Sequence, residues 1–300
     1  MFIDIHAHAY RVKTPGPCNF CTAEELIAEY DRLGIAVGTL QPIVSPEIYL
    51  PQTNEDILEM VEKYPKRLRA FCNIDPRALT NSPAAPLGTL LSYYKERGAK
   101  GVGEVMPNLP LKDPRVQNLL YHAQQQDLPV TFDGSDGYSG DFGIIDEPGL
   151  PQLEHTLQAM PKLRIFGHGP VFWSEIGRLK TPAERSYFFS FRGQFVGRMP
   201  EGRIDEEGVV PTLFRRYPNL LGDLSDATAY NAFARDDVYG PAFMEEFQDR
   251  LYFGTDFVCP GMSVPLIELM QDWRETGKIS KPAFDKISHE NAAKLLDIEL

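Results

Sequence analysis

Short and nearly continuous apolar runs recur along the whole chain, and each ends close to a glycine, proline, aspartate or histidine. Such runs are typical of parallel strands buried on both faces, because a strand with one face in water alternates apolar and polar residues. Eight runs fit this description. The strands that they predict are Phe2–Ile5, Val37–Ile43, Leu68–Ile74, Gly101–Met106, Pro129–Asp133, Arg164–Gly167, Leu220–Leu224 and Leu251–Thr255.

Helical signals separate these runs. Thr22 and Glu25 have the spacing of a capping box, in which two side chains satisfy backbone amides at the start of a helix. A second helix is predicted to begin at Thr53, where apolar residues follow at helical spacing. The same spacing predicts two further helices, which end before Pro129 and before Pro161. Strands and helices therefore alternate along the sequence.

The alternation predicts an α/β protein whose residues 1–300 form one (β/α)8 TIM barrel, for which this length is ordinary. An open doubly wound sheet is the rival fold, but no G-x-G-x-x-G motif follows the first strand. The interval after the sixth strand is longer than one helix requires. It predicts an insertion at about 174–207, either overhanging the barrel mouth or forming a solvated surface excursion.

Composition narrows the classes of partner. Hydrophobic residues make up 43% and charged residues 24%, as in globular proteins, and the formal charge is −12. A negative chain lacks the clustered positive charge that nucleic acid requires, and no apolar run is long enough to cross a membrane. The start shows no basic or apolar leader, and four cysteines fit free thiols, so we expect a cytoplasmic protein.

Polar residues that bind metals follow four of the predicted strands. His6 and His8 are two residues apart and therefore share one face of the first strand. Asp133, His168 and Asp256 end the fifth, sixth and eighth strands. In a barrel all strand ends meet at one rim, and burying such groups without partners would cost several kcal/mol. Imidazole and carboxylate groups gathered in this way indicate a metal site.

These segments resemble the signature of a known superfamily. Phe2–His8, Phe166–His168 and Tyr252–Asp256 are similar to the metal-site segments of the amidohydrolase superfamily. The tail Ile287–Leu296 resembles the closing helix of the branch that includes 2-amino-3-carboxymuconate-6-semialdehyde decarboxylase. The resemblance implies a metal-dependent, hydrolase-like TIM barrel that holds one divalent ion and that, like many barrels of this branch, forms a homodimer.

The resemblance also implies roles for individual residues. His6 and His8 match the metal ligands of the first strand, and Asp256 matches the carboxylate that binds metal and handles a proton. His168 matches the histidine that positions or activates the water on the metal. The fifth strand departs from the family pattern, because Asp133 stands where a ligand histidine is usual.

This departure bears on the metal. If Asp133, Asp256 and Glu104 at the end of the fourth strand were all ionised beside a dication, the group would carry a net charge of −1. Such ligation favours Mn²⁺ and weakens the Lewis acidity that activates water. Either Asp133 replaces the histidine, or the metal is bound loosely or not at all, and Glu104 is either a ligand or a structural carboxylate. We expect an occupied site with Zn²⁺, and Mn²⁺ or another divalent ion as the alternative.

The net positive charge of the predicted insertion bears on the charge of the substrate. The segment 178–203 carries a local charge of +4, which favours an anionic small-molecule substrate and a carboxylate clamp formed by Arg192 or Arg198. Tyr138 is a further candidate substrate contact. Trp173 either walls the pocket or belongs to the core. The charged residues of the segment are Arg178, Lys180, Arg185, Arg192, Arg198 and Arg203, against Glu184 and Glu201.

The resulting hypothesis is a metal-dependent hydrolase of a small, carboxylate-bearing substrate, in which Asp256 takes a proton from water and His168 stabilises the developing charge. Non-oxidative decarboxylation by the same residues is the first alternative. A barrel that only binds a ligand is the second.

Overall fold

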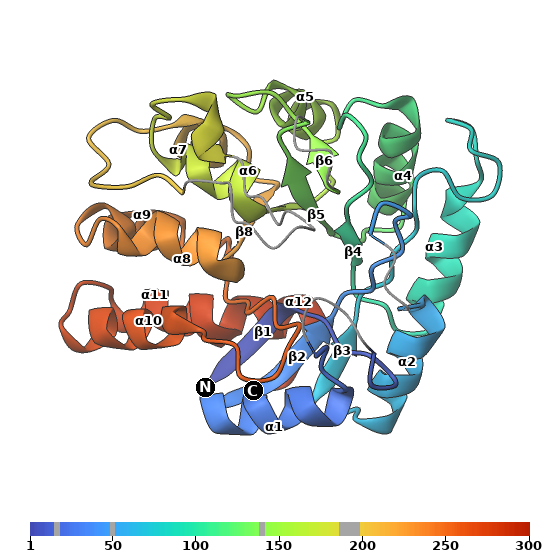
Figure 1. Cartoon of the computed structure of the whole chain (residues 1–300), viewed down its shortest axis with the longest axis horizontal. Coiled ribbons are helices and arrows are strands. Elements are labelled where there is room, and N and C mark those ends of the chain that lie inside the picture. The colour runs from blue at the N-terminus through green and yellow to red at the C-terminus, as the bar shows by residue number, and fades with distance from the viewer. Residues whose placement is uncertain (15–18, 49–51, 138–141, 186–198) are drawn as a thin grey trace.

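The computed structural model describes residues 1–14, 19–48, 52–137, 142–185 and 199–300, and each predicted strand is present within them (Figure 1). The observed strands lie within or a few residues beyond the predicted ranges. They are β1 (Phe2–Ala7), β2 (Ile35–Leu40), β3 (Leu68–Ala70), β4 (Val102–Val105), β5 (Val130–Ser135), β7 (Ile165–His168), β8 (Leu220–Asp223) and β9 (Leu251–Tyr252). A short additional strand, β6 (Ile144–Ile145), pairs with the end of β5.

The strands close into a barrel. Neighbouring strands pair in parallel in the orders β1-β2-β3 and β4-β5-β7-β8-β9. A parallel bridge between Cys72 and Val102 joins β3 to β4, and another between Ala7 and Phe257 joins β1 to the segment after β9. The amide of His8 donates to the carbonyl of Phe257 at 2.8 Å across this second seam. The predicted (β/α)8 TIM barrel is therefore confirmed.

Helices surround the barrel, and their caps follow the sequence (Figure 1). The hydroxyl of Thr22 accepts from the amide of Glu25, whose carboxylate accepts in return from the amide of Thr22, and Thr53 forms the same box with Asp56. The helices are α1 (Ala23–Leu33), α2 (Asn54–Lys63), α3 (Leu87–Glu96), α4 (Pro114–Gln125), α5 (Pro151–Ala159), α6 (Gly169–Trp173), α7 (Val209–Arg216), α8 (Asp226–Ala234), α9 (Tyr239–Phe247), α10 (Pro265–Glu275), α11 (Lys281–Asp285) and α12 (Asn291–Leu296), with the 3-10 turns η1 (Ser174–Ile176) and η2 (Pro182–Arg185) and the π-helical segment η3 (Lys286–Glu290).

The insertion after the sixth barrel strand is closed at its base. Gly177 and Glu207 form an antiparallel bridge, and the amide of Gly208 donates to the carbonyl of Ile176 at 3.0 Å. These contacts place the two ends of the insertion side by side just before α7 begins.

The interior of the barrel is apolar where the strands begin. Ile3, Phe166 and Leu221 from three strands are buried in one cluster with Leu296 of α12. The larger core cluster lies between the strands and the surrounding helices. The closing helix α12 therefore covers one end of the barrel, and polar groups gather at the other end.

Two expectations from composition have different outcomes. No helix in the described residues combines the length and the apolar character needed to cross a membrane. Cys21 and Cys72 are buried free thiols, as expected, but Cys259 is disulfide-bonded, which contradicts the expectation of free thiols throughout. Cys18 lies outside the described residues.

A buried carboxylate holds the seam between the first and last strands. Asp4 is fully buried, and its oxygens accept hydrogen bonds from the amides of His6 at 3.0 Å and Thr255 at 2.9 Å. The hydroxyls of Thr255 and of Tyr30 on α1 donate to the other oxygen at 2.6 and 2.7 Å. Burial nevertheless raises the pKa of Asp4 to about 6, because desolvation outweighs these hydrogen bonds.

Replacing Tyr30 with phenylalanine removes one donor to this carboxylate and keeps the ring. We expect Tyr30→Phe to lower the free energy of unfolding by about 1–3 kcal/mol, because a buried acceptor loses a partner. Tyr94→Phe is the matched control, since the hydroxyl of Tyr94 donates to Glu55 at the surface, and we expect a change of about 0.5 kcal/mol or less. Urea unfolding measures both, and equal losses would contradict the assignment.

The raised pKa of Asp4 also predicts a pH dependence. Between pH 3.8 and about 6 the folded protein holds a proton that the unfolded chain has released, so rising pH destabilises the folded state. The contribution of Asp4 to the free energy of unfolding should fall by about 3 kcal/mol across this window. The difference in that free energy between wild type and Asp4→Asn, measured from pH 4 to 7, should fall and then level off. If the difference in the free energy of unfolding grew with pH, it would contradict this interpretation.

Candidate active site

The carboxyl ends of the barrel strands gather titratable side chains that are far apart in sequence. Most of them are buried, and Asp133 and Asp256 are partly exposed. The group comprises His6 and His8 at the end of β1, Glu104 on β4, Asp133 on β5, His168 on β7, Asp223 on β8 and Asp256 after β9. The sequence prediction that these strand ends share one rim agrees with this placement.

Four of these side chains surround one point. His6, His8, Glu104 and Asp256 each place one ligand atom within 4.8 Å of the others. The Nε2 atoms of the two histidines are 3.2 Å apart, and each is 3.4 Å from Oε2 of Glu104. Oδ1 of Asp256 is 3.2 Å from Nε2 of His8 and 3.8 Å from that of His6. Two imidazole nitrogens and two carboxylate oxygens form a donor set that fits a divalent cation.

Neighbouring acceptors orient both imidazoles. Nδ1 of His6 is 2.6 Å from Oδ2 of Asp223, and Nδ1 of His8 is 2.7 Å from the backbone carbonyl oxygen of Gln41. These oxygens accept hydrogen bonds, so each Nδ1 carries a proton. The Nε2 lone pairs then face the shared point, as metal-binding histidines held by outer partners do.

The pKa values of the residues around this shared point show which charge it attracts. Burial lowers the pKa of His6, but Asp223 and Glu104 outweigh that effect and raise it well above its usual value. In the same way, hydrogen bonds with Asp256 and Glu104 raise the pKa of His8 to about 9 against the effect of burial. Burial raises the pKa of Glu104, yet the surrounding histidines bring it well below its usual value. The point therefore attracts positive charge, which either protons or a metal cation can supply.

Asp133 belongs to a different group from the one that its position in the sequence implied. Asp133 forms a second potential ligand group with Glu104 and His168. It is not part of the first group, which consists of His6, His8, Glu104 and Asp256. Nε2 of His168 is 3.4 Å from Oε1 of Glu104, so the two oxygens of Glu104 face different histidines. Oδ1 of Asp133 has no hydrogen-bond partner in the described residues, and burial together with Glu104 and Asp256 raises the pKa of Asp133 well above its usual value. Glu104, not Asp133, completes the set around His6 and His8.

Three residues that contact the site were not predicted from the sequence. Asp223 is the last residue of β8 and lies one residue before the end of the predicted strand Leu220–Leu224, so it carries nearly the same signal that identified His168 and Asp256. Gln41 contributes its backbone carbonyl, for which no residue type is a signal. Ser225 lies two residues beyond Asp223, with its hydroxyl 3.0 Å from Nδ1 of His168.

The candidate substrate contacts give a mixed outcome. Trp173 is fully buried, packs against Phe233, and donates from its indole nitrogen to the carbonyl of Asp223 at 2.8 Å. Of the two expected roles, the burial and packing of Trp173 support the core. The remaining candidates lie outside the described part of the chain: Tyr138, Arg192 and Arg198.

Two described cations of the insertion contact carboxylates within or beside it. Arg178 pairs with Glu206 at 2.7 Å, and the buried Arg185 pairs with Glu175 at 3.2 Å. The excess of basic residues in the sequence therefore does not translate into free cations at these positions.

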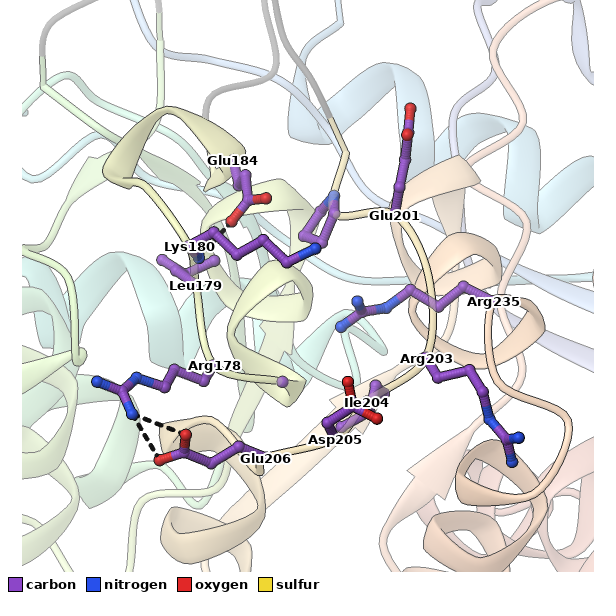
Figure 2. A pocket seen from close by; sticks show the side chains of 12 residues that line it. Arg178, Leu179, Lys180, Glu184, Glu201, Arg203, Ile204, Asp205, Glu206 and Arg235 are labelled. Atoms are coloured by element: carbon purple, nitrogen blue, oxygen red, sulfur yellow. Dashed lines mark hydrogen bonds and ion pairs between the residues drawn. The ribbon is translucent and has the colours of Figure 1, made fainter.

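A cleft of about 400 Å³ lies within the insertion (Figure 2). Figure 2 shows Lys180 and Arg235 directed into it and Arg203 directed away, with Glu184 beside Lys180. The residues that line this cleft are separate from those at the barrel end. The cleft and the histidine-carboxylate group are thus two distinct features of the described chain.

Comparison with known proteins agrees with the fold. The amidohydrolase family model matches residues 3–298. No curated protein matches the sequence. An uncharacterised TIM-barrel protein from Bordetella bronchiseptica is 16% identical, with a TM-score of 0.64 and coverage of 99% of this chain and 98% of that chain.

Two further solved structures have printed activities. A probable 2-pyrone-4,6-dicarboxylic acid hydrolase from Acinetobacter baumannii is 14% identical, with a TM-score of 0.62 and coverage of 99% of both chains. The 5-carboxyvanillate decarboxylase from Novosphingobium aromaticivorans, complexed with manganese, is 15% identical, with a TM-score of 0.62 and coverage of 99% of this chain and 96% of that chain. At these identities the likeness shows a shared fold.

Metal titration separates the two carboxylates. We expect Glu104→Gln to weaken the binding of Mn²⁺ or Zn²⁺ by at least ~10-fold, because it removes a ligand oxygen and a negative charge. Asp133→Asn should change the affinity by less than about threefold, since Asp133 lies outside the first group. Calorimetric titration of chelator-treated protein measures both, with the exposed Glu147→Gln as a control. A larger loss for Asp133→Asn would make Asp133 the ligand.

Proposed function

Because the chain belongs to the amidohydrolase family, we propose that it is a metal-dependent enzyme that removes carbon dioxide from a small, carboxylate-bearing substrate. The observation that carries this proposal is the set of two imidazoles and two carboxylates formed by His6, His8, Glu104 and Asp256. These residues would hold one divalent ion.

The charge of the ligand set favours decarboxylation over hydrolysis. Ionised Glu104 and Asp256 neutralise a divalent ion, and Asp223 and Asp133 add further carboxyl groups close by. Such surroundings reduce the Lewis acidity on which water activation depends and suit Mn²⁺ as well as Zn²⁺. Decarboxylation requires no attacking water, so it tolerates this loss better than hydrolysis does. When bound, the ion supplies positive charge that holds an anionic substrate and stabilises negative charge developing on it.

The residues of the chain then have separate tasks. In the reaction the bond between the substrate carbon and its carboxylate breaks, the electron pair stays on that carbon, and a proton takes the place of the departing carbon dioxide. Asp256 has a side chain that is 25% exposed, whereas those of His6, His8 and Glu104 are almost fully buried. It therefore faces both the ligand group and solvent, and we assign it the transfer of the proton. Nε2 of His168 is 3.4 Å from the other carboxylate oxygen of Glu104, and we assign His168 the orientation of the substrate.

Product analysis tests the proposal. Protein loaded with Mn²⁺ or Zn²⁺ is incubated with hydroxybenzoates, dicarboxylates and lactones, each carboxylate carrying a carbon-13 label. We expect labelled carbon dioxide from at least one acid, and a loss of at least ~100-fold in kcat for Asp256→Asn, because the proton transfer is then removed. Asp237→Asn, which changes an exposed carboxylate paired with Lys278, should keep full activity.

Other outcomes assign other functions to the same site. Ring opening or ester cleavage that takes up water and yields no carbon dioxide would make the protein a hydrolase. Tight binding of an acid that needs no metal, with no turnover of any compound, would make it a ligand-binding barrel. Either result overturns the proposed decarboxylation.

A further inference from the structure

Backbone groups of the insertion hold the walls of its cleft in place. The amide of Arg178 donates to the carbonyl of Glu206 at 2.9 Å, which joins the two ends of the insertion. The side-chain amide of Asn231 on α8 donates to the carbonyl of Pro200 at 3.0 Å, which joins the insertion to that helix. The cleft is therefore built by the fold, and its volume of about 400 Å³ lies in the range of about 300–1,000 Å³ that small-molecule sites occupy.

Four cationic side chains line this cleft, and two of them are engaged elsewhere. Nη1 of Arg178 donates to both carboxylate oxygens of Glu206, at 2.7 and 2.9 Å. Arg203 is directed away from the cleft, and its Nε is 3.8 Å from Oδ2 of Asp236 (Figure 2). Neither side chain offers its charge to a molecule in the cleft.

The other two cations, Lys180 and Arg235, are directed into the cleft, and neither forms an ion pair within the described part of the chain (Figure 2). Arg235 has five N–H groups, of which one donates to the carbonyl of Gly202 at 3.4 Å. Its Nε is buried and has no acceptor among the described residues. Burial lowers the pKa of Arg235, and the attraction of Glu184 does not offset this effect. The guanidinium group has thus lost water while most of its donors stay unused.

The acidic side chains of the lining leave these two charges largely uncompensated. Oε2 of Glu184 already accepts from the backbone amides of Lys180 at 2.6 Å and Thr181 at 3.3 Å. Figure 2 shows Glu201 extending away from both cations, and Asp205 is exposed to solvent. An anion in the cleft therefore meets two cations that the surrounding carboxylates do not bind.

We propose that this cleft binds a small organic anion, whose carboxylate or phosphate group is held between Lys180 and Arg235. The planar guanidinium group matches two oxygens of such an anion, and the ammonium group adds a compact charge from the opposite element. The volume of the cleft leaves room for an organic molecule attached to the anionic group. The residues involved are separate from those at the barrel end, so the inference does not depend on the proposed decarboxylation.

Titration with succinate and with inorganic phosphate tests the proposal on the full-length, metal-loaded protein. The readout is the nitrogen-15 and proton signal of the Arg235 Nε group, which is assigned by its loss in Arg235→Lys and does not report on the barrel end. We expect at least one of the two anions to shift this signal to saturation with a dissociation constant of about 1 mM or lower. Tighter binding of succinate identifies a carboxylate ligand, and tighter binding of phosphate identifies a phosphate ester.

Two variants that keep Arg235 locate the second charge. Lys180→Ala should weaken the binding of the anion by at least ~10-fold, because a hydrogen bond between charged groups is lost. Lys180 is exposed, so this change leaves the fold intact. Arg203→Ala is the matched control: it removes the same charge from the same lining, but from a side chain that is directed away, and should change the affinity by less than about threefold.

Two results would overturn the inference. One is an Arg235 signal that neither succinate nor phosphate shifts. The other is an equal loss of affinity in Lys180→Ala and Arg203→Ala, because binding would then follow the general charge of the insertion and not a site between two particular cations.

Discussion

The carboxylate of Glu104 lies among three imidazoles, and the arrangement of the site depends on it. Oε2 faces His6 and His8 and Oε1 faces His168, at 3.4 Å in each contact. A buried negative charge needs compensation, and here it comes from side chains on other strands. The barrel supplies them because β4 and β7 end at the same rim as β1. A metal ion or protons on the rings can both satisfy Glu104, which explains why the same geometry raises the pKa values of His6 and His8 and suits a cation.

Much of this arrangement could be predicted from the sequence, because the signals are local. Buried parallel strands give continuous apolar runs, and the capping box at Thr22 needs only four consecutive residues. His6 and His8 could be placed together from the two-residue period of a strand. His168 and Asp256 stood out because a polar residue ends an apolar strand, and Asp223 gives nearly the same signal, so it could have been included.

The remaining features depend on contacts between distant segments. Whether Glu104 or Asp133 joins His6 follows from how two neighbouring strands present their side chains, which no local pattern records. Gln41 acts through its backbone. The net charge of the insertion does not show which of its cations are free, for the same reason. Arg178 and Arg185 add to that charge, but in the fold they pair with the carboxylates of Glu206 and Glu175.

The seam between the first strand and the segment after β9 has a consequence for synthesis. Asp4 is satisfied only when Thr255 arrives, and His8 pairs with the backbone of Phe257. A growing chain emerges from the ribosome amino terminus first, so the side chains of Asp4, His6 and His8 stay in water, without their partners from the end of the chain, until most of the chain has been made. The earliest residues to be translated are among the last to find their partners, and the finished site is a product of the whole polypeptide, never of a nascent fragment.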